Sequence, residues 1–177
     1  MKQLINRHSE GVFIIAATPF SENGELDLLS TDLLIDFYLK SGVSGMTILG
    51  IMGEAQKLTA EESLTFARHV LNRVDGRIPI IVGVSGASLD NMKSLTNMVM
   101  ELGAAGVMVA PMSSLGTETK LDQYFKQVCT SLGPDVPICL QDYPQTTGVQ
   151  FSVETILKLT RENEQIVMLK HEDWPGL

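Results

Sequence analysis

Six short apolar runs constrain the fold of this chain more than any other feature of its sequence. They follow one another at intervals of roughly thirty residues, the length of one βα unit. Each run is apolar on both faces and rich in β-branched residues, which is typical of a buried parallel strand. The predicted strands are Val12–Ala16, Met46–Leu49, Ile78–Val82, Val107–Ala110, Ile138–Leu140 and Ile166–Leu169.

Amphipathic helices are predicted between these strands. The segment Leu28–Lys40 places Leu29, Leu33 and Phe37 on one face, as in a helix that packs on a sheet, and Gly42 ends it. The other helices are predicted over 59–74 (opened by a capping box of Thr59 and Glu62), Asp90–Leu102, Leu121–Leu132 and Ser152–Thr160.

The alternation of strand and helix predicts an α/β fold with a parallel sheet and right-handed crossovers. We expect one domain over residues 1–177. A doubly wound sheet and a TIM (β/α)₈ barrel both fit this alternation, and composition does not separate them. A nucleotide-binding Rossmann sheet is disfavoured because the first βα loop has no GxGxxG sequence.

Charge and composition exclude several functional classes. The net charge of −8, with thirteen scattered Lys and Arg residues, argues against a nucleic-acid partner. Cys129 and Cys139 lie in apolar surroundings without a CxxC spacing, so we expect reduced core thiols. The three histidines form no metal-binding pattern, and no apolar stretch is long enough for a membrane span. We therefore expect a cytoplasmic protein with no metal ion and no cofactor.

Two loops after strands carry residues of possible chemical use. The second strand is followed by Gly50, Ile51, Met52 and Gly53, then by Glu54. Two glycines let a backbone approach a ligand closely, and exposed N–H groups there can hold a carboxylate. The first loop, 17–20 (Ala-Thr-Pro-Phe), is interpreted as a strand end and a turn.

Polar residues also end the fifth and sixth strands. Gln141 and Tyr143 follow the fifth strand with the same parity, so their side chains should point to the same side. Lys170 follows the apolar run of the sixth strand, and Glu172 shares its parity. Such a lysine can reach water or pair with Glu172. Alternatively, burial lowers the pKa of its amine and leaves it able to attack a carbonyl.

Taken together, these motifs resemble the dihydrodipicolinate synthase / N-acetylneuraminate lyase family. The Thr-Pro-Phe loop, the Gly-x-x-Gly-Glu loop, the Pro-x-x-Thr-Gly stretch after the fifth strand and Lys170 fall in the family's order between Gly11 and Glu172. The resemblance implies a (β/α)₈ barrel and an imine between Lys170 and the carbonyl of pyruvate or another 2-oxo acid. The substrate carboxylate would rest on the loop at Ile51 and Met52.

The departures from the family pattern bear on the substrate. Ile51 and Met52 stand where family members that make dihydrodipicolinate or cleave sialic acid carry hydroxyl residues. Gln141 stands where the same enzymes carry a catalytic tyrosine. Glutamine cannot shuttle a proton near neutral pH, and Tyr143 is a candidate to reach inward in its place. The Gln-Asp-x-Pro stretch at 141–144, with Lys-x-Glu at 170–172 on the next strand, resembles the sugar-acid branch, whose dehydratases and aldolases act on 2-keto-3-deoxy sugar acids. Dihydrodipicolinate synthase-type aldol condensation of pyruvate is the alternative.

The chain supplies about six of the eight units of a barrel, which typically takes about 250 residues. The first and sixth strands should therefore expose their edges, and we expect a homo-oligomer. A hypothesis of another class is a catalytically silent fragment or pseudo-enzyme that serves as an assembly module. Retention of Lys170 favours the enzyme, whereas loss of the tyrosine favours the silent module.

Overall fold

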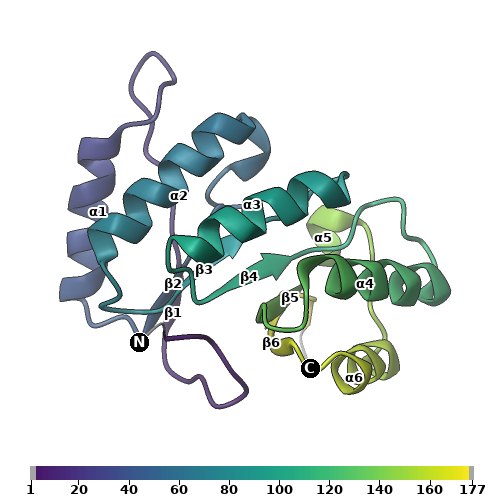
Figure 1. Ribbon diagram of the computed structural model, residues 1–177. Coiled ribbons are helices and arrows are strands. Elements are labelled where there is room, and N and C mark those ends of the chain that lie inside the picture. The colour runs from purple at the N-terminus through teal and green to yellow at the C-terminus, as the bar shows by residue number, and fades with distance from the viewer. Residues whose placement is uncertain (1–2, 176–177) are drawn as a thin grey trace.

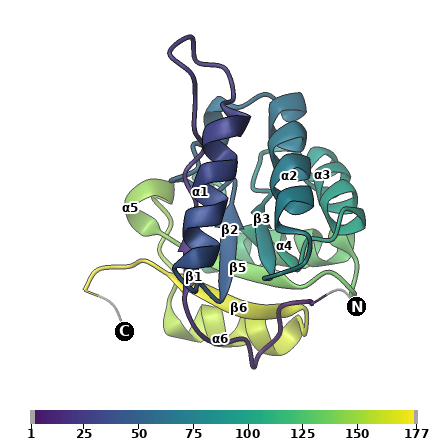
Figure 2. The same ribbon diagram turned by 90° about the vertical axis from the view of Figure 1, so that its left-hand side faces the viewer.

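A computed structural model describes residues 3–175 and shows one curled sheet of six strands with helices on its outer side (Figures 1 and 2). The strands are β1 (Phe13–Ile15), β2 (Gly45–Ile48), β3 (Ile80–Gly83), β4 (Gly106–Val109), β5 (Ile138–Asp142) and β6 (Ile166–His171). The helices are α1 (Leu28–Lys40), the 3₁₀ helix η1 (Ala55–Lys57), α2 (Ala60–Val74), α3 (Leu89–Glu101), α4 (Glu118–Leu132), α5 (Pro144–Thr147) and α6 (Val153–Glu162).

The strand order separates the two folds that the alternation allowed. The order is β1-β2-β3-β4-β5-β6, and every neighbouring pair is parallel. A doubly wound sheet reverses its strand order at a switch point, whereas a barrel adds each strand beside the last. The prediction of a TIM barrel with about six units is therefore confirmed.

Apolar side chains form a layer on each face of the sheet. The larger layer lies between the strands and the helices and includes Phe66 and Phe125. The smaller one fills the inside of the curl, where Ile81, Met108 and Cys139 pack together with Ile5. The Ile5 N–H donates a 2.9 Å hydrogen bond to the carbonyl just before β4, so the N-terminal segment closes the amino end of the curl.

Local signals placed the long elements to within a few residues. Thr59 and Glu62 form the predicted capping box, in which the hydroxyl accepts from the Glu62 N–H and the carboxylate accepts from the Thr59 N–H. The sequence pattern did not predict η1 and α5, because helices of three and four residues are too short to show a helical period. Both follow a strand end and shape the loops that carry candidate site residues.

The predicted packing face of α1 is wrong. Leu29, Leu33 and Phe37 are 62–80% exposed, whereas Thr31 and Ile35 on the opposite side are buried. Helix α1 is the first of the row and has α2 on one side (Figure 2). A closed barrel places another helix on the other side of α1. The described residues supply none there, and the apolar face is left open.

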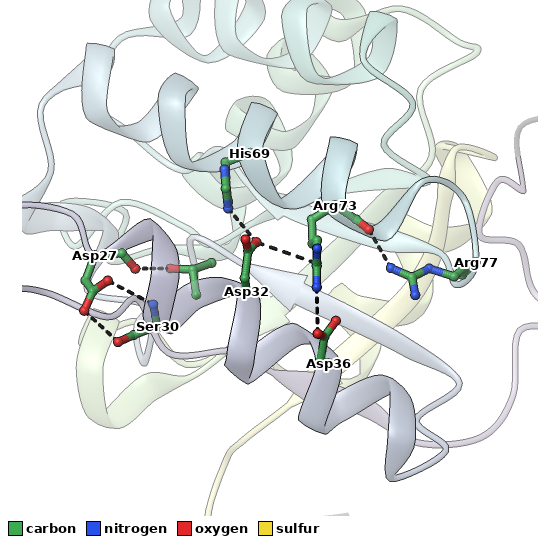
Figure 3. A network of polar contacts seen from close by, with 8 residues as sticks. Asp27, Ser30, Asp32, Asp36, His69, Arg73 and Arg77 are labelled. Atoms are coloured by element: carbon green, nitrogen blue, oxygen red, sulfur yellow. Dashed lines mark hydrogen bonds and ion pairs between the residues drawn. The ribbon is translucent and has the colours of Figure 1, made fainter.

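Polar contacts instead fix α1 against α2 (Figure 3). Asp32 accepts a 2.8 Å hydrogen bond from His69, and Asp36 lies 2.6 Å from the guanidinium of Arg73. Both contacts join α1 to α2. The orientation of α1 on the sheet therefore depends on these polar contacts as well as on its apolar residues.

The sheet edges are more open than its centre, as expected for an incomplete barrel. Strands β2 to β5 are buried throughout, whereas most residues of β1 and β6 are partly exposed. The carboxyl end of β6, which carries Lys170, therefore lies beside an unpaired strand edge.

Candidate active site

The loop after β2 lies against the backbone of β3. Leu49 adopts a left-handed conformation, with φ of 54°, and its carbonyl points at Gly83. A Cβ atom on Gly83 would lie 2.0 Å from the Leu49 oxygen, so only glycine fits at this position. The close approach fixes where the loop 50–53 starts.

Both glycines of this loop are also closely packed. A Cβ on Gly50 would lie 3.3 Å from the Met108 methyl group, and one on Gly53 would lie 3.2 Å from the Ala16 carbonyl oxygen. The buried Thr18 hydroxyl donates a 2.7 Å hydrogen bond to the Gly53 carbonyl. Thr18 thus joins the first loop to the second, a structural role in line with the interpretation of loop 17–20 as a turn.

The backbone of this loop presents free donors. Within residues 3–175, neither a carbonyl nor a side chain accepts a hydrogen bond from the N–H of Ile51 or Met52. The loop turns because the Glu54 N–H donates to the Ile51 carbonyl at 3.0 Å. Two unpaired N–H groups at a strand end are suited to an anionic ligand.

Lys170 lies opposite Gln141 in the register of β5 and β6. Its amine forms an ion pair with the Glu172 carboxylate, and its side chain is 19% exposed. The buried Gln141 amide donates to the same Glu172 oxygen at 2.8 Å. The Lys170 amine also lies over the Tyr143 ring, 6.0 Å from its centre. The pairing of Lys170 with Glu172, one of the two predicted environments, is therefore present.

These residues line one cavity of about 290 Å³ at the carboxyl ends of the strands. Its lining consists of Ile15, Gly50, Ile51, Met52, Met108, Gln141, Tyr143, Lys170 and Glu172. The structure thus brings seven of the eight predicted site residues together. The exception is Gly53, which packs behind the loop, while Met52 contributes from a largely exposed position. Ile15 and Met108 were missed because apolar strand residues carry no chemical signal in sequence.

A second polar pair lies on the outer face of the same strands. Asp142, which is 1% exposed, and His171 share a 2.8 Å hydrogen bond between Oδ2 and Nδ1. Burial raises the pKa of Asp142, and the contact with His171 opposes that rise. Their parity is opposite to that of Gln141 and Lys170, so the pair joins the ends of β5 and β6 and does not line the cavity.

The remaining candidate groups lie outside this site. Both cysteines are buried free thiols, as predicted, and burial raises the pKa of Cys129 to about 11 and that of Cys139 to about 12. Residues 3–175 contain no group of three or more His, Cys, Asp or Glu side chains that could hold a metal ion. In the same range, no helix is long and apolar enough to cross a membrane.

Comparison with known proteins decides the family. A sequence model of the Dihydrodipicolinate synthetase family matches residues 8–172. The chain belongs to this family. Its lysine-bearing strand β6 and the loop after β2 both lie within the matched segment. Relatives of the chain carry the names of synthases and aldolases.

Three relatives illustrate the range of the family. The 4-hydroxy-tetrahydrodipicolinate synthase of Coxiella burnetii (strain Dugway 5J108-111) is 34% identical over 154 residues, which are 85% of this chain and 52% of that protein. The crystal structure of dihydrodipicolinate synthase from Rhodopseudomonas palustris has a TM-score of 0.94 at 42% identity, covering 97% of this chain and 57% of that one.

The third relative is YagE from Escherichia coli K12, named "Putative 2-dehydro-3-deoxy-D-gluconate aldolase YagE". Its structure in complex with pyruvate has a TM-score of 0.84 at 31% identity, covering 91% of this chain and 54% of that one. The chain thus spans about half the length of the relatives it matches.

Proposed function

We propose that the protein is a Schiff-base lyase that acts on a 2-oxo acid, with Lys170 as the imine-forming residue. One observation carries the proposal: the Lys170 amine lies in the cavity at the carboxyl ends of the strands, where active sites of barrel enzymes gather. The substrate class is a 2-keto-3-deoxy sugar acid or pyruvate. YagE, named as an aldolase of such an acid and solved with pyruvate, supports this choice.

The proposed residue roles follow from the geometry. The neutral Lys170 amine attacks the carbonyl carbon, and loss of water gives a protonated imine that withdraws electrons from the neighbouring carbons. Glu172, paired with this amine, takes up the proton that the ammonium must lose first and gives it to the hydroxyl that departs as water, so its carboxylate is ionised again once the imine has formed. The free N–H groups of Ile51 and Met52 receive the substrate carboxylate.

Two further functions were predicted from the sequence. Aldol condensation of pyruvate, as in a dihydrodipicolinate synthase, uses the same imine and is favoured by the names of the Coxiella and Rhodopseudomonas relatives. Gln141 stands where such synthases carry a tyrosine, so we rank aldol condensation behind the lyase activity. The silent assembly module shares the fold but would form no imine. Homo-oligomerisation and cytoplasmic location stay predictions.

Borohydride trapping with the full-length protein tests the proposal. The protein is incubated with pyruvate or with a 2-keto-3-deoxy sugar acid, reduced with sodium borohydride and mapped by mass spectrometry. We expect a reduced adduct on Lys170 that is absent from Lys170→Ala. Lys158→Ala, which removes a half-exposed lysine of α6, is the matched control and should keep the adduct. A folded protein without an adduct would refute the proposal and favour the silent module.

A further inference from the structure

Imine chemistry leaves one role to assign, namely the group that takes the proton from C3 of the bound acid. Among the described residues that line the cavity, only Tyr143, Lys170 and Glu172 carry a titratable side chain. Lys170 is consumed in the imine, and the Gln141 amide is not a base. Resting on the proposed function, we propose that Glu172 is the general base that removes the C3 proton, with Gln141 as its positioning residue.

Distance favours Glu172. One carboxylate oxygen of Glu172 is in direct contact with the Lys170 amine. In the imine, C3 is two bonds from that nitrogen, which puts it about 2.5 Å away. An oxygen that touches the nitrogen therefore reaches C3 or its hydrogen by a small rotation of the side chain, which meets the first requirement for a general base.

Tyr143 is less well placed. Its ring centre lies 6.0 Å from the Lys170 amine, which faces the ring rather than a lone pair. A phenol brings its own proton, which it must give up before it can accept another, whereas an ionised carboxylate is only an acceptor. We assign Tyr143 to packing against the imine nitrogen.

The carboxylate of Glu172 is held in place from β5. The Gln141 side chain, 2% exposed, donates its amide to the Glu172 oxygen at 2.8 Å. The Glu172 backbone N–H donates to the Asp142 carbonyl at 2.8 Å, which fixes the other end of the residue. A base fixed at both ends is preorganised, as an efficient proton acceptor should be.

The proposed step balances without a co-reactant. Glu172 takes the proton from C3, the C–H electron pair forms a double bond between C2 and C3, and the imine electrons return to nitrogen. The protonated Glu172 then either gives the proton back to C3 or gives it to a hydroxyl on C4. In the second case, the hydroxyl leaves as water and the enamine electrons restore the imine.

Hydrogen–deuterium exchange of the pyruvate methyl group isolates this step. The protein is placed with pyruvate in D₂O, loss of the methyl signal is followed by ¹H NMR, and borohydride trapping on Lys170 is run in parallel. The measured quantity is the exchange rate divided by the amount of trapped imine. In Glu172→Gln, which can still accept from Gln141, we expect this quotient to fall about 100-fold or more.

Three variants complete the design. Tyr143→Phe, which removes the phenol and keeps the ring, should lower the quotient far less than Glu172→Gln does. Glu162→Gln, a surface acid that pairs with Lys126, is the control for loss of one charge and should leave it unchanged. In Glu172→Ala, added formate should restore part of the exchange, because a small carboxylate can fill the space.

The outcomes separate this assignment from the proposed function. Absence of a Lys170 adduct in the unmodified protein would refute the imine itself. An adduct together with an unchanged quotient in Glu172→Gln would retain the imine and overturn Glu172 as the base. Loss of exchange in Tyr143→Phe, with exchange kept in Glu172→Gln, would transfer the role to the tyrosine.

Discussion

Replacing Gly83 by alanine should displace the loop that we propose to bind the substrate carboxylate. The added Cβ would lie 2.0 Å from the Leu49 oxygen and 2.8 Å from its carbonyl carbon, whereas ordinary contact begins at 3.4 Å. The Leu49 carbonyl must therefore move by about 1.4 Å, the difference between 3.4 Å and 2.0 Å. Since Gly83 is buried in β3 and Leu49 is 3% exposed, neither can turn toward solvent.

The displacement has a cost in stability and a cost in activity. Forcing extra atoms into a packed interior costs about 1–3 kcal/mol. A misplacement of about 1 Å at a binding group costs up to roughly 100-fold in rate. We therefore expect Gly83→Ala to lower the free energy of unfolding by about 1–3 kcal/mol and to slow adduct formation on Lys170 by at least ten-fold.

Urea unfolding and the rate of borohydride-trapped adduct formation measure the two effects. Gly86→Ala is the matched control, because a Cβ there meets no atom within 4 Å and its φ is not in the left-handed region. If Gly83→Ala matched Gly86→Ala in both measurements, the close approach of Leu49 to β3 would not position the loop, and the reasoning would be refuted.

Three further changes test other features. Thr59→Ala should cost about 1 kcal/mol by urea unfolding, because its hydroxyl accepts from the Glu62 N–H at the start of α2. Cys129 and Cys139 should resist Ellman's reagent at pH 8 in the folded protein and react in urea, since a pKa of about 11 or 12 leaves about one thiol in a thousand or fewer ionised. The raised pKa of Asp142 means that its contribution to stability is complete below 3.8 and is lost as pH rises through the raised value. Unfolding measured across this range should therefore show Asp142→Asn gaining stability relative to the unmodified protein as pH increases.

Much of the site could be predicted because its residues follow the ends of regular strands. Parallel strands end at one edge of a sheet, so Gly50, Gln141 and Lys170 had to lie near one another once the strands were assigned. Parity then placed Tyr143 and Glu172 on the same side as their neighbours. In the structure, all five of these residues line the same cavity.

Other features depended on contacts that no local pattern encodes. The hydrogen bond from Gln141 to Glu172 joins residues 31 positions apart, and the one from Thr18 to Gly53 joins residues 35 apart. The apolar face of α1 shows the same limit, because a helical period gives the face but not what covers it.

The sequence by itself determined the βα alternation, the bounds of the long elements and the strand end that carries Lys170, because these depend on neighbours within a few turns of the chain. Tertiary structure decided the rest. Strand order distinguished a barrel from a doubly wound sheet, and the pairing of β5 with β6 brought Gln141 to Glu172. The physical reason is that the sheet's hydrogen bonds and the packing on both its faces join segments far apart in sequence, so side-chain partners are settled only when the whole sheet forms.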